Sequence, residues 1–472
     1  MSRLRHNEEM LPGAYVFKGS HRVVRMRAIQ RQWVVATIAS GSVLLTLGGR
    51  ATAQAIRVGS ETAVEIGLPD RPLVEPTLAI HPTDSRHLLG AAMAWDAPAG
   101  NIRCTTFLSL DGGVEWTRHD LPLLGCFDPW VAITPDGQAV FVAFGRDPKL
   151  PYQFSAGPVV YHSPDGGQTW DEQPTGLGVV TDHPTAIADG NAARRNWLYV
   201  MSTQFDGPEF RRASIAISRS RDGGKTFDLP LYIRPNNLMR GAQTAAILSD
   251  GSLLASFVEN RTADGRRLQR HHAWVVRLRP GDDHFSDPMF VGDACETLSS
   301  GSSGMWFSWL VADTSSSPFR DRLYYVCVQR ATREILVAHS SDSGATWTDA
   351  RPIFSVHRDT LTTPRLMAAT VNGRGVLGLV WPETRPRPGG DCSHIYFLAS
   401  LDGGDTFLRE TRLTHAPACK SLANGSARSD YYGIVGDDRG RFRVLWSDAR
   451  GGLFSLHTIV IEVEGTVGPK SK

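Results

Sequence analysis

One eight-residue pattern occurs five times in this chain, and its spacing constrains the fold more than any other feature. The pattern is a serine, an aspartate two positions later, a glycine two positions after that, and then Thr or Glu before an aromatic residue. The five copies, which we call octads, are Ser109–Trp116, Ser163–Trp170, Ser220–Phe227, Ser340–Trp347 and Ser400–Phe407. Their aspartates are 54, 57, 120 and 60 residues apart, so the long interval holds two periods. A period of about 50 to 60 residues suits a four-stranded propeller blade, which buries its faces only when neighbouring blades stack on it.

Within each period, two short apolar runs flank a tight-turn dipeptide such as Asp136-Gly137, Asp250-Gly251 or Asn372-Gly373. These dipeptides are strong hairpin signals because the turn requires positive φ, and the runs therefore predict the first two strands of a blade. A third strand leads into the octad, which we expect to form the turn to the fourth strand. Its aspartate should bond nearby backbone N–H groups, and its aromatic residue should pack between sheets. Five copies of one motif indicate a structural rather than a catalytic role.

The pattern predicts an all-β propeller of four-stranded antiparallel blades, with seven blades as our interpretation and six as the alternative. Blades are expected to start near Glu75, Asp128, Asp182, Arg240, Gly304, Thr363 and Asp430. The fourth period keeps only a remnant octad, Leu278–Phe285, and the seventh has none. The last blade therefore lacks an outer strand, and we predict that Ala55–Val58 supplies it and closes the ring.

Composition excludes several other classes of protein. The 472 residues are 41% hydrophobic, enough for a large core. The 50 basic and 48 acidic residues give a net charge of +2, and no long single-sign run marks the repeat region, so nucleic acid is not an expected partner.

The N-terminal part predicts export. From Met26, a basic segment with Arg27 and Arg31 precedes an apolar stretch over 33–47 and small-residue cleavage sites near Ala53 and Ala55. We interpret residues 1–25 as a leader or misassigned start, 26–55 as a signal peptide, 56–465 as the propeller and 466–472 as a tail. An uncleaved membrane anchor is the alternative for the apolar stretch, and the predicted location is secreted or periplasmic.

Six cysteines fall into three sequence-neighbouring pairs. Because export permits disulfides, we predict the bonds Cys104–Cys126, Cys295–Cys327 and Cys392–Cys419. Each would close a loop of roughly 20 to 30 residues, worth about 3 kcal/mol in the chain-entropy model. Free buried thiols are the alternative, and no Cys-x-x-Cys spacing supports zinc.

The octads resemble the Asp-box of the sialidase-like (bacterial neuraminidase repeat) propellers, and the resemblance covers roughly residues 56–465. It implies the propeller fold without fixing an activity, because Asp-boxes also occur in sortilin-like receptors, xyloglucan-cleaving hydrolases and photosystem assembly factors. Sialidases use three arginines on the substrate carboxylate, a Tyr nucleophile helped by Glu, and an Asp acid/base. One of those arginines comes from an Arg-Ile-Pro segment near the first blade. The corresponding segment here, Val74–Ile80, lacks it.

Ligand sites of propellers gather at one mouth of the central channel, where the innermost strands begin. The residues at those strand starts are Glu75, Asp128, Trp130, Asp182, His183, Arg240, Met305, Trp306, Arg365, Tyr431 and Tyr432. They include the carboxylates, arginines and aromatic faces that a glycosidase needs for proton transfer, for an anionic group and for sugar stacking.

The resemblance implies specific roles for these residues. Tyr431 or Tyr432 would be the nucleophile, activated by an adjacent carboxylate because a phenol with a pKa near 10 is almost un-ionised at neutral pH. Asp128 or Asp182 would be the acid/base, with Glu75 as a further catalytic carboxylate. Arg240 and Arg365 would clamp the substrate carboxylate, and Trp130 and Trp306 would stack on sugar. For each of these residues a structural role stays open. The carboxylates and His183 could only hydrogen-bond the nearby backbone, the tyrosines could pack in the core, and the arginines could be exposed to solvent or have a structural role.

Two functions follow. The first is an exported, exo-α-sialidase-like glycoside hydrolase acting on a terminal and acidic sugar. The alternative is a non-catalytic propeller that binds a glycan or a protein, and an envelope scaffold is a third. No cofactor is expected, and a calcium ion among the mouth carboxylates is the one metal left open.

Overall fold

The computed structural model describes sixteen stretches of the chain between residues 55 and 469. They are 55–67, 71–96, 101–123, 125–145, 157–178, 181–206, 212–234, 244–261, 267–293, 308–329, 334–355, 368–385, 392–419, 429, 431–450 and 454–469. The predicted leader and almost all of the signal peptide lie outside these residues, as do Arg240, Cys295, Met305, Trp306, Arg365 and Asp430.

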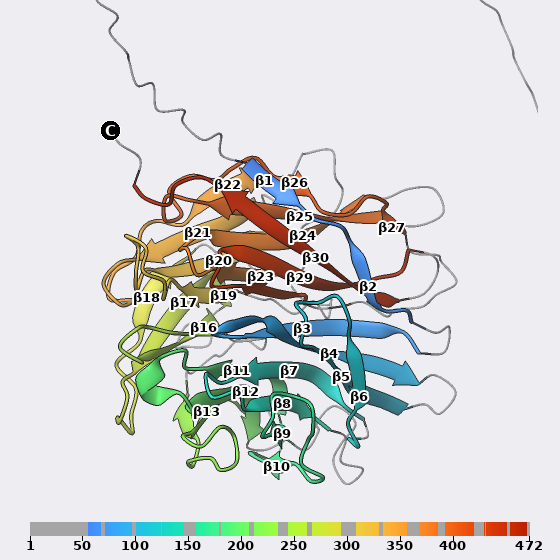
Figure 1. The fold of residues 1–472 in the computed structure, drawn as a ribbon. Coiled ribbons are helices and arrows are strands. Elements are labelled where there is room, and N and C mark those ends of the chain that lie inside the picture. The colour runs from blue at the N-terminus through green and yellow to red at the C-terminus, as the bar shows by residue number, and fades with distance from the viewer. Residues whose placement is uncertain are drawn as a thin grey trace, which may run out of the picture. The chain divides into compact units, whose positions relative to one another are not determined.

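Seven antiparallel sheets form the blades, and the seven-bladed prediction is confirmed (Figure 1). Blade 1 holds β3 (Leu73–His81), β4 (Asp84–Asp96), β5 (Asn101–Ser109) and β6 (Thr117–Asp120); blade 2 holds β7 (Phe127–Ile133), β8 (Ala139–Phe144), β9 (Val159–Ser163) and β10 (Thr175–Gly176). Blade 3 holds β11 (Thr181–Ala188), β12 (Leu198–Asp206), β13 (Arg212–Ser220) and β14 (Leu231–Ile233); blade 4 holds β15 (Ala245–Ile247), β16 (Leu253–Arg261), β17 (Arg267–Leu278) and β18 (Met289–Gly292).

The remaining blades follow the same order. Blade 5 holds β19 (Trp309–Ala312), β20 (Leu323–Gln329), β21 (Glu334–Ser340) and β22 (Arg351–Ser355); blade 6 holds β23 (Ala368–Val371), β24 (Leu377–Arg385), β25 (Cys392–Ser400) and β26 (Thr411–Arg412), with β27 (Ala418–Cys419) also on β25. Blade 7 holds β28 (Gly433–Gly436), β29 (Arg441–Asp448), β30 (Ser455–Glu464) and β1 (Ala55–Val58), with β2 (Thr62–Glu65) also on β30. The one helix among the described residues is a 3-10 turn over Ala192–Arg194, and no described helix is long and apolar enough to cross a membrane.

The first strands of the blades line the centre of the ring. Each contacts the first strand of the next blade, from β3 to β7 and onward round to β28, which contacts β3 again. Because the strands are antiparallel and consecutive, the starts of all first strands share one face of the ring. The turns between first and second strands and the octads share the opposite face.

The ring is closed by the N-terminal strand, as predicted. In Figure 1 the blue β1 lies beside the red β30, and its four residues pair with Ile461–Glu464. Next to it, Arg450 Nη2 lies 2.5 Å from Glu61 Oε1, which joins the segment between β1 and β2 to blade 7. Closure by both ends of the chain therefore gives blade 7 the fourth strand that its C-terminal part lacks, and β2 adds a fifth.

The octads form the predicted turns between third and fourth strands. In every copy the serine hydroxyl donates to the aspartate at 2.8–2.9 Å and accepts the N–H of the second glycine at 2.7–2.9 Å. The aspartate in turn accepts the backbone N–H four residues later, as Asp165 does from Thr169 at 2.8 Å. The second glycine needs positive φ, for example +104° at Gly167, which only glycine adopts at little cost.

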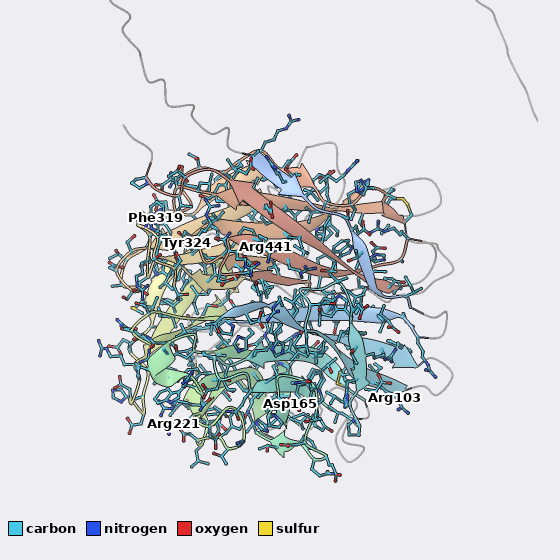
Figure 2. The ribbon with its side chains drawn as sticks, in the orientation of Figure 1. Arg103, Asp165, Arg221, Phe319, Tyr324 and Arg441 are labelled. Atoms are coloured by element: carbon cyan, nitrogen blue, oxygen red, sulfur yellow. A yellow bond between two sulfur atoms is a disulfide. The ribbon has the colours of Figure 1, made fainter. Side chains whose placement is uncertain are left out.

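The octads also join neighbouring blades. Side chains in or directly before the second strand of one blade reach the octad carbonyls of the next blade. His87 Nε2 on β4 lies 2.7 Å from Gly166 O, and Arg322, which precedes β20, donates to Gly403 O at 2.8 Å. Arg443 on β29 donates to Gly112 O and so links blade 7 to blade 1. The Arg322 guanidinium lies 4.6 Å from the centre of the Phe319 ring, and Figure 2 labels Phe319 together with Tyr324 of the same blade. The motif therefore braces the ring on the face opposite the strand starts.

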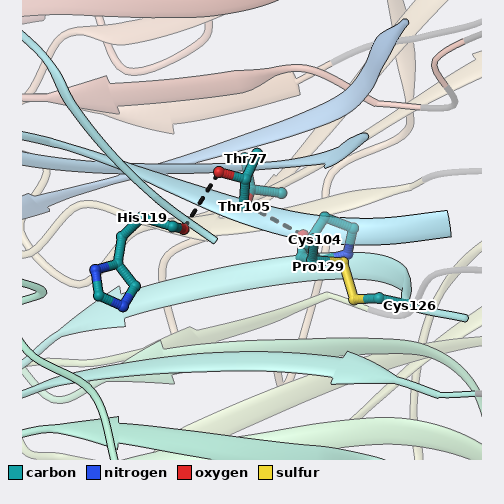
Figure 3. Close-up of a disulfide and its surroundings, with 6 residues drawn as sticks. All are labelled: Thr77, Cys104, Thr105, His119, Cys126 and Pro129. Atoms are coloured by element: carbon teal, nitrogen blue, oxygen red, sulfur yellow. Dashed lines mark hydrogen bonds between the residues drawn. A yellow bond between two sulfur atoms is a disulfide. The ribbon is translucent and has the colours of Figure 1, made fainter. Parts of the chain in front are cut away.

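Two of the three predicted disulfides are confirmed, Cys104–Cys126 and Cys392–Cys419. Cys327 is also disulfide-bonded, while Cys295 lies outside the described residues. The Cys104–Cys126 bond ties β5 of blade 1 to the segment that enters blade 2, with a Cα–Cα distance of 5.6 Å (Figure 3). Beside it, the Thr77 hydroxyl donates to Pro129 O at 3.1 Å, so two links hold the start of β7 against blade 1.

Candidate functional site

The first strands of blades 1, 2 and 3 begin in the same unusual way. Each carries a break in pairing just where a residue precedes a proline: Glu75, Asp128 and His183. All three adopt positive φ, at 56°, 50° and 47°. A proline has no N–H to donate to the ladder, which explains the break. Positive φ is costly for residues other than glycine and clusters at functional sites.

This arrangement changes the predicted alignment of the third blade. The sequence places Asp182 in line with Glu75 and Asp128, whereas the structure places His183 there and Asp182 one residue earlier. The tripeptide Asp182-His183-Pro184 therefore contributes two functional groups, of which the histidine was interpreted only as a strand-start residue.

Asp128, Asp182 and His183 come together at the start of β7 and β11. Asp128 Oδ2 lies 3.1 Å from His183 Nδ1 and accepts the His183 backbone N–H at 3.2 Å. On the other side of the imidazole, His183 Nε2 lies 3.5 Å from Asp182 Oδ1. The exposed fractions of the side chains are 10% for Asp128, 1% for His183 and 28% for Asp182, so Asp182 is the most open to solvent.

Glu75 lies at the equivalent position of blade 1. Its side chain is buried, and its backbone N–H donates to the hydroxyl of Ser429 at 2.9 Å. Ser429 precedes the first strand of blade 7, so this bond joins the strand starts of two neighbouring blades. The backbone N–H groups of both Glu75 and His183 are thus bonded by a side chain from the preceding blade.

Aromatic rings from three blades meet around Trp130. Trp130 on β7 lies 6.1 Å from the Trp309 ring on β19 and 5.8 Å from the Tyr431 ring beside β28, measured between centroids. Because these residues belong to blades 2, 5 and 7, the contacts cross the centre of the ring. Trp309 was missed from the sequence, where the start of blade 5 was expected near Gly304 and Trp306 was chosen. An apolar strand that begins with tryptophan looks the same in sequence whether the tryptophan lies at the centre of the ring or in the core between two blades.

The two predicted nucleophiles are both covered. Tyr431 and Tyr432 are 2% and 7% exposed and belong to the hydrophobic core between blades 5, 6 and 7. Burial raises the pKa of Tyr432 well above its usual value, and the nearby Asp448 carboxylate raises it further. Both effects disfavour a phenolate at this position.

Asp448, another residue that the sequence did not indicate as functional, ends β29. Burial alone would raise the pKa of Asp448, but hydrogen bonds from Arg450 and Trp446 and the charge of His457 outweigh it and leave the pKa lowered. Arg450 Nη2 and Trp446 Nε1 lie 2.5 and 2.9 Å from Asp448 Oδ2. The carboxylate is therefore held ionised beside Tyr432.

Two groups of described residues offer three metal-ligand atoms each: Asp128, Asp182 and His183, and Glu61, Asp448 and His457. In the second group Arg450 already pairs with both carboxylates. In the first, the imidazole turns a different nitrogen toward each carboxylate, and a single cation binds one imidazole nitrogen. Neither geometry favours a three-ligand cation site, and the calcium hypothesis gains no specific support. The predicted ligand arginines Arg240 and Arg365, like Trp306, lie outside the described residues.

No protein-family model and no curated protein matches the chain. Among solved structures, a protein of unknown function from Dyadobacter fermentans is 14% identical with a TM-score of 0.48, covering 87% of this chain and 99% of that one. A Hadza microbial sialidase, Hz136, is 14% identical with a TM-score of 0.46, covering 87% and 95%. A Trypanosoma rangeli sialidase in complex with sialic acid is 16% identical with a TM-score of 0.44, covering 73% and 55%. The class of fold, a seven-bladed β-propeller, is defined here by the blades themselves.

Proposed function

We propose that this chain is an exported, sialidase-like glycoside hydrolase that acts on a terminal sugar at the face where the first strands begin. The observation that supports it is the convergence of Asp128, Asp182 and His183 at the starts of blades 2 and 3. Glycosidases need a carboxyl group that exchanges a proton with the glycosidic oxygen, and they bind sugar faces on aromatic rings. Trp130, on the same strand as Asp128, supplies such a ring.

In this proposal Asp182 is the acid/base, because it is the most exposed carboxylate of the cluster. Asp128 accepts the backbone N–H of His183 and so helps to hold this strand start, and Glu75 is a further carboxylate at the neighbouring strand start. Tyr432, with Asp448 as its carboxylate partner, and Tyr431 stay the candidate nucleophiles. Arg240 and Arg365 stay the proposed contacts for an acidic group on the sugar. The two disulfides suit an oxidising compartment and so support export.

A second function is favoured by one observation, the burial of both tyrosines. A covered phenol with a raised pKa is a poor nucleophile, so a propeller that binds a glycan without cleaving it is the alternative. In that case the aromatic and carboxylate groups would serve recognition alone.

Turnover of a fluorogenic sialoside and a panel of aryl glycosides separates the two functions. The hydrolase proposal expects release that falls at least about 100-fold in Asp182→Asn, in line with the usual contribution of general acid catalysis. Asp283→Asn is the matched control, because that side chain is 96% exposed on blade 4. Release equal to that of the parent in Asp182→Asn would refute the assigned acid/base. Saturable glycan binding without turnover would support the alternative.

A further inference from the structure

Trp95 is the one exposed tryptophan among the described residues, with 42% of its surface open to solvent. It stands near the end of β4, the second strand of blade 1, and the second strands end on the face where the first strands begin. Single exposed apolar side chains are common on protein surfaces. The surroundings of Trp95 therefore decide whether its exposure has a role.

Strand pairing shows which way the Trp95 side chain points. Trp95 pairs with Ile102 on β5, and two residues further along the same ladder Met93 pairs with Cys104, with no register shift between them. Side chains alternate along a strand and paired residues share a face, so Trp95 lies on the same face as these three residues. All three belong to the core cluster between blades 1 and 2. Trp95 therefore lies at the solvent end of that cluster, on the side of blade 1 that faces blade 2.

The start of blade 2 is attached to the same part of blade 1. The Cys126 N–H donates to Ile102 O at 3.1 Å, so the residue that pairs with Trp95 is bonded to the segment that enters β7. Phe127 comes next, and its ring stacks on that of Phe144 at the end of β8, with 5.2 Å between the centroids. Both phenylalanines are half-buried, and Phe127 packs against the core cluster that Trp95 covers.

Aromatic side chains thus extend outward from the candidate site. Trp130 at the centre of the ring shares β7 with Phe127 and Asp128, and Trp95 stands one strand further out on the neighbouring blade. Neighbouring strands are about 4.8 Å apart, which is close to the width of one sugar ring. Aromatic faces are large, rigid apolar surfaces of the kind on which a pyranose ring stacks. A glycan whose terminal sugar lies at the starts of β7 and β11 would therefore place its second sugar toward Trp95.

We propose that Trp95 binds the sugar to which the terminal sugar is linked, so that the substrate is a glycan of two or more sugars. This inference rests on the proposed hydrolase function, in which that second sugar is the leaving group. An aromatic face suits an uncharged pyranose, and stacking requires no particular pattern of hydroxyl groups. Trp95 therefore selects for the presence of a second sugar and leaves the choice of terminal sugar to the residues at the strand starts.

The kinetic test compares two substrates with the same terminal sugar. Sialyllactose releases a disaccharide, whereas a methyl sialoside releases methanol, which is too small to stack. We expect Trp95→Ala to lower kcat/KM for sialyllactose about 10-fold and to change that for the methyl sialoside by less than about 2-fold. Trp95→Phe keeps a smaller flat ring and should recover most of the loss. Phe290→Ala is the matched control, because Phe290 is 46% exposed on the outermost strand of blade 4.

Equal effects of Trp95→Ala on the two substrates would overturn the inference and leave the hydrolase proposal standing. A melting temperature of Trp95→Ala close to that of the parent would show that a selective loss does not come from unfolding.

A binding measurement tests Trp95 independently of turnover. The 12 tryptophans of the whole chain are replaced by fluorotryptophan, and the ¹⁹F signal of Trp95 is the one that disappears in Trp95→Phe. We expect sialyllactose and lactose to shift this signal in a saturable way, in the parent and in Phe290→Ala alike. A Trp95 signal that neither sugar moves would overturn the inference. A saturable shift without cleavage would support Trp95 as a sugar-binding residue and would show that the hydrolase proposal is the part that fails.

Discussion

The octad of blade 5 offers a sharp test of how this ring is stabilised, because it holds a buried, hydrogen-bonded serine directly before an exposed one. Ser340 is 1% exposed, and its hydroxyl accepts the buried Gly344 N–H at 2.9 Å and donates to Asp342 at 2.8 Å. Ser341 is exposed. Replacing each by alanine compares a buried connector with a neighbouring hydroxyl in the same turn.

The expected cost of Ser340→Ala follows from the two bonds. A buried N–H left without a partner costs about 1–3 kcal/mol, and a lost bond to a charged carboxylate adds about 1.5 kcal/mol, so we expect about 3 kcal/mol. An unfolding entropy of about 2.1 cal/mol/K per residue gives roughly 0.9 kcal/mol/K for a domain of this size. The melting temperature should therefore fall by about 3 °C in Ser340→Ala and by less than about 0.5 °C in Ser341→Ala.

Differential scanning calorimetry at neutral pH without reductant measures both values. The corresponding serines 109, 163, 220 and 400 make the same two bonds, so their alanine variants should fall within about a factor of two of Ser340→Ala. Equal melting temperatures for Ser340→Ala and Ser341→Ala would refute the view that the octad serine satisfies a costly buried donor.

Three further predictions concern the same ring. Hydrogen bonds from the Glu115 N–H and the Ser109 hydroxyl lower the pKa of Asp111. The contribution of the Asp111 carboxylate to folding stability is therefore complete above the unfolded pKa near 4 and is lost as pH falls through the lower folded value. A urea midpoint that does not drop between pH 5 and pH 3 would contradict this. The Cys392–Cys419 bond has a sequence separation of 27, so its removal should lower the free energy of unfolding by about 3.5 kcal/mol and the melting temperature by about 4 °C. Calorimetry of the double variant Cys392→Ala with Cys419→Ala tests this value. Deleting residues 55–62 should lower the melting temperature by more than this, because blade 7 loses its outer strand and Arg450 loses its ion pair with Glu61. An unchanged melting temperature in calorimetry would argue against ring closure by β1.

Much of the architecture could be predicted because each blade repeats the same local rules. The octad combines a short-range carboxylate turn with glycines at positive φ, and both depend on residues within eight positions. The outer strand Ala55–Val58 was predictable because an open edge in blade 7 left one missing partner. The fold could therefore be predicted from short-range hydrogen-bonding motifs that recur at nearly even intervals along the chain.

The candidate site was less predictable because it depends on contacts between blades. Whether Asp182 or His183 occupies the strained position is decided by where the pairing with β12 breaks, and the sequence of β11 alone does not record that break. Trp309 is placed at the centre of the ring through its contact with Trp130, which is 179 positions earlier in the chain. The burial of Tyr431 and Tyr432 likewise follows from how blades 5, 6 and 7 pack, which no tyrosine motif encodes.

The strained strand starts support the proposal that the face where the first strands begin is the functional face. Glu75, Asp128 and His183 each accept positive φ before a proline, a conformation that costs of order 1–3 kcal/mol and that glycine would adopt more cheaply. Glycine would remove the side chain, and at two of the three positions that side chain forms the Asp128–His183 contact. On the opposite face, the serine and carboxylate bonds of the octads repeat five times. The expected contribution of one octad serine, about 3 kcal/mol, is similar to the strain energy of one such residue. Positive φ at non-glycine residues also occurs on the opposite face, at Asp321 and at Ser343 of an octad. The three strand starts differ from these two positions because each of them precedes a proline and because the side chains of Asp128 and His183 contact each other. This grouping of costly conformations with contacting polar side chains supports the site that we propose.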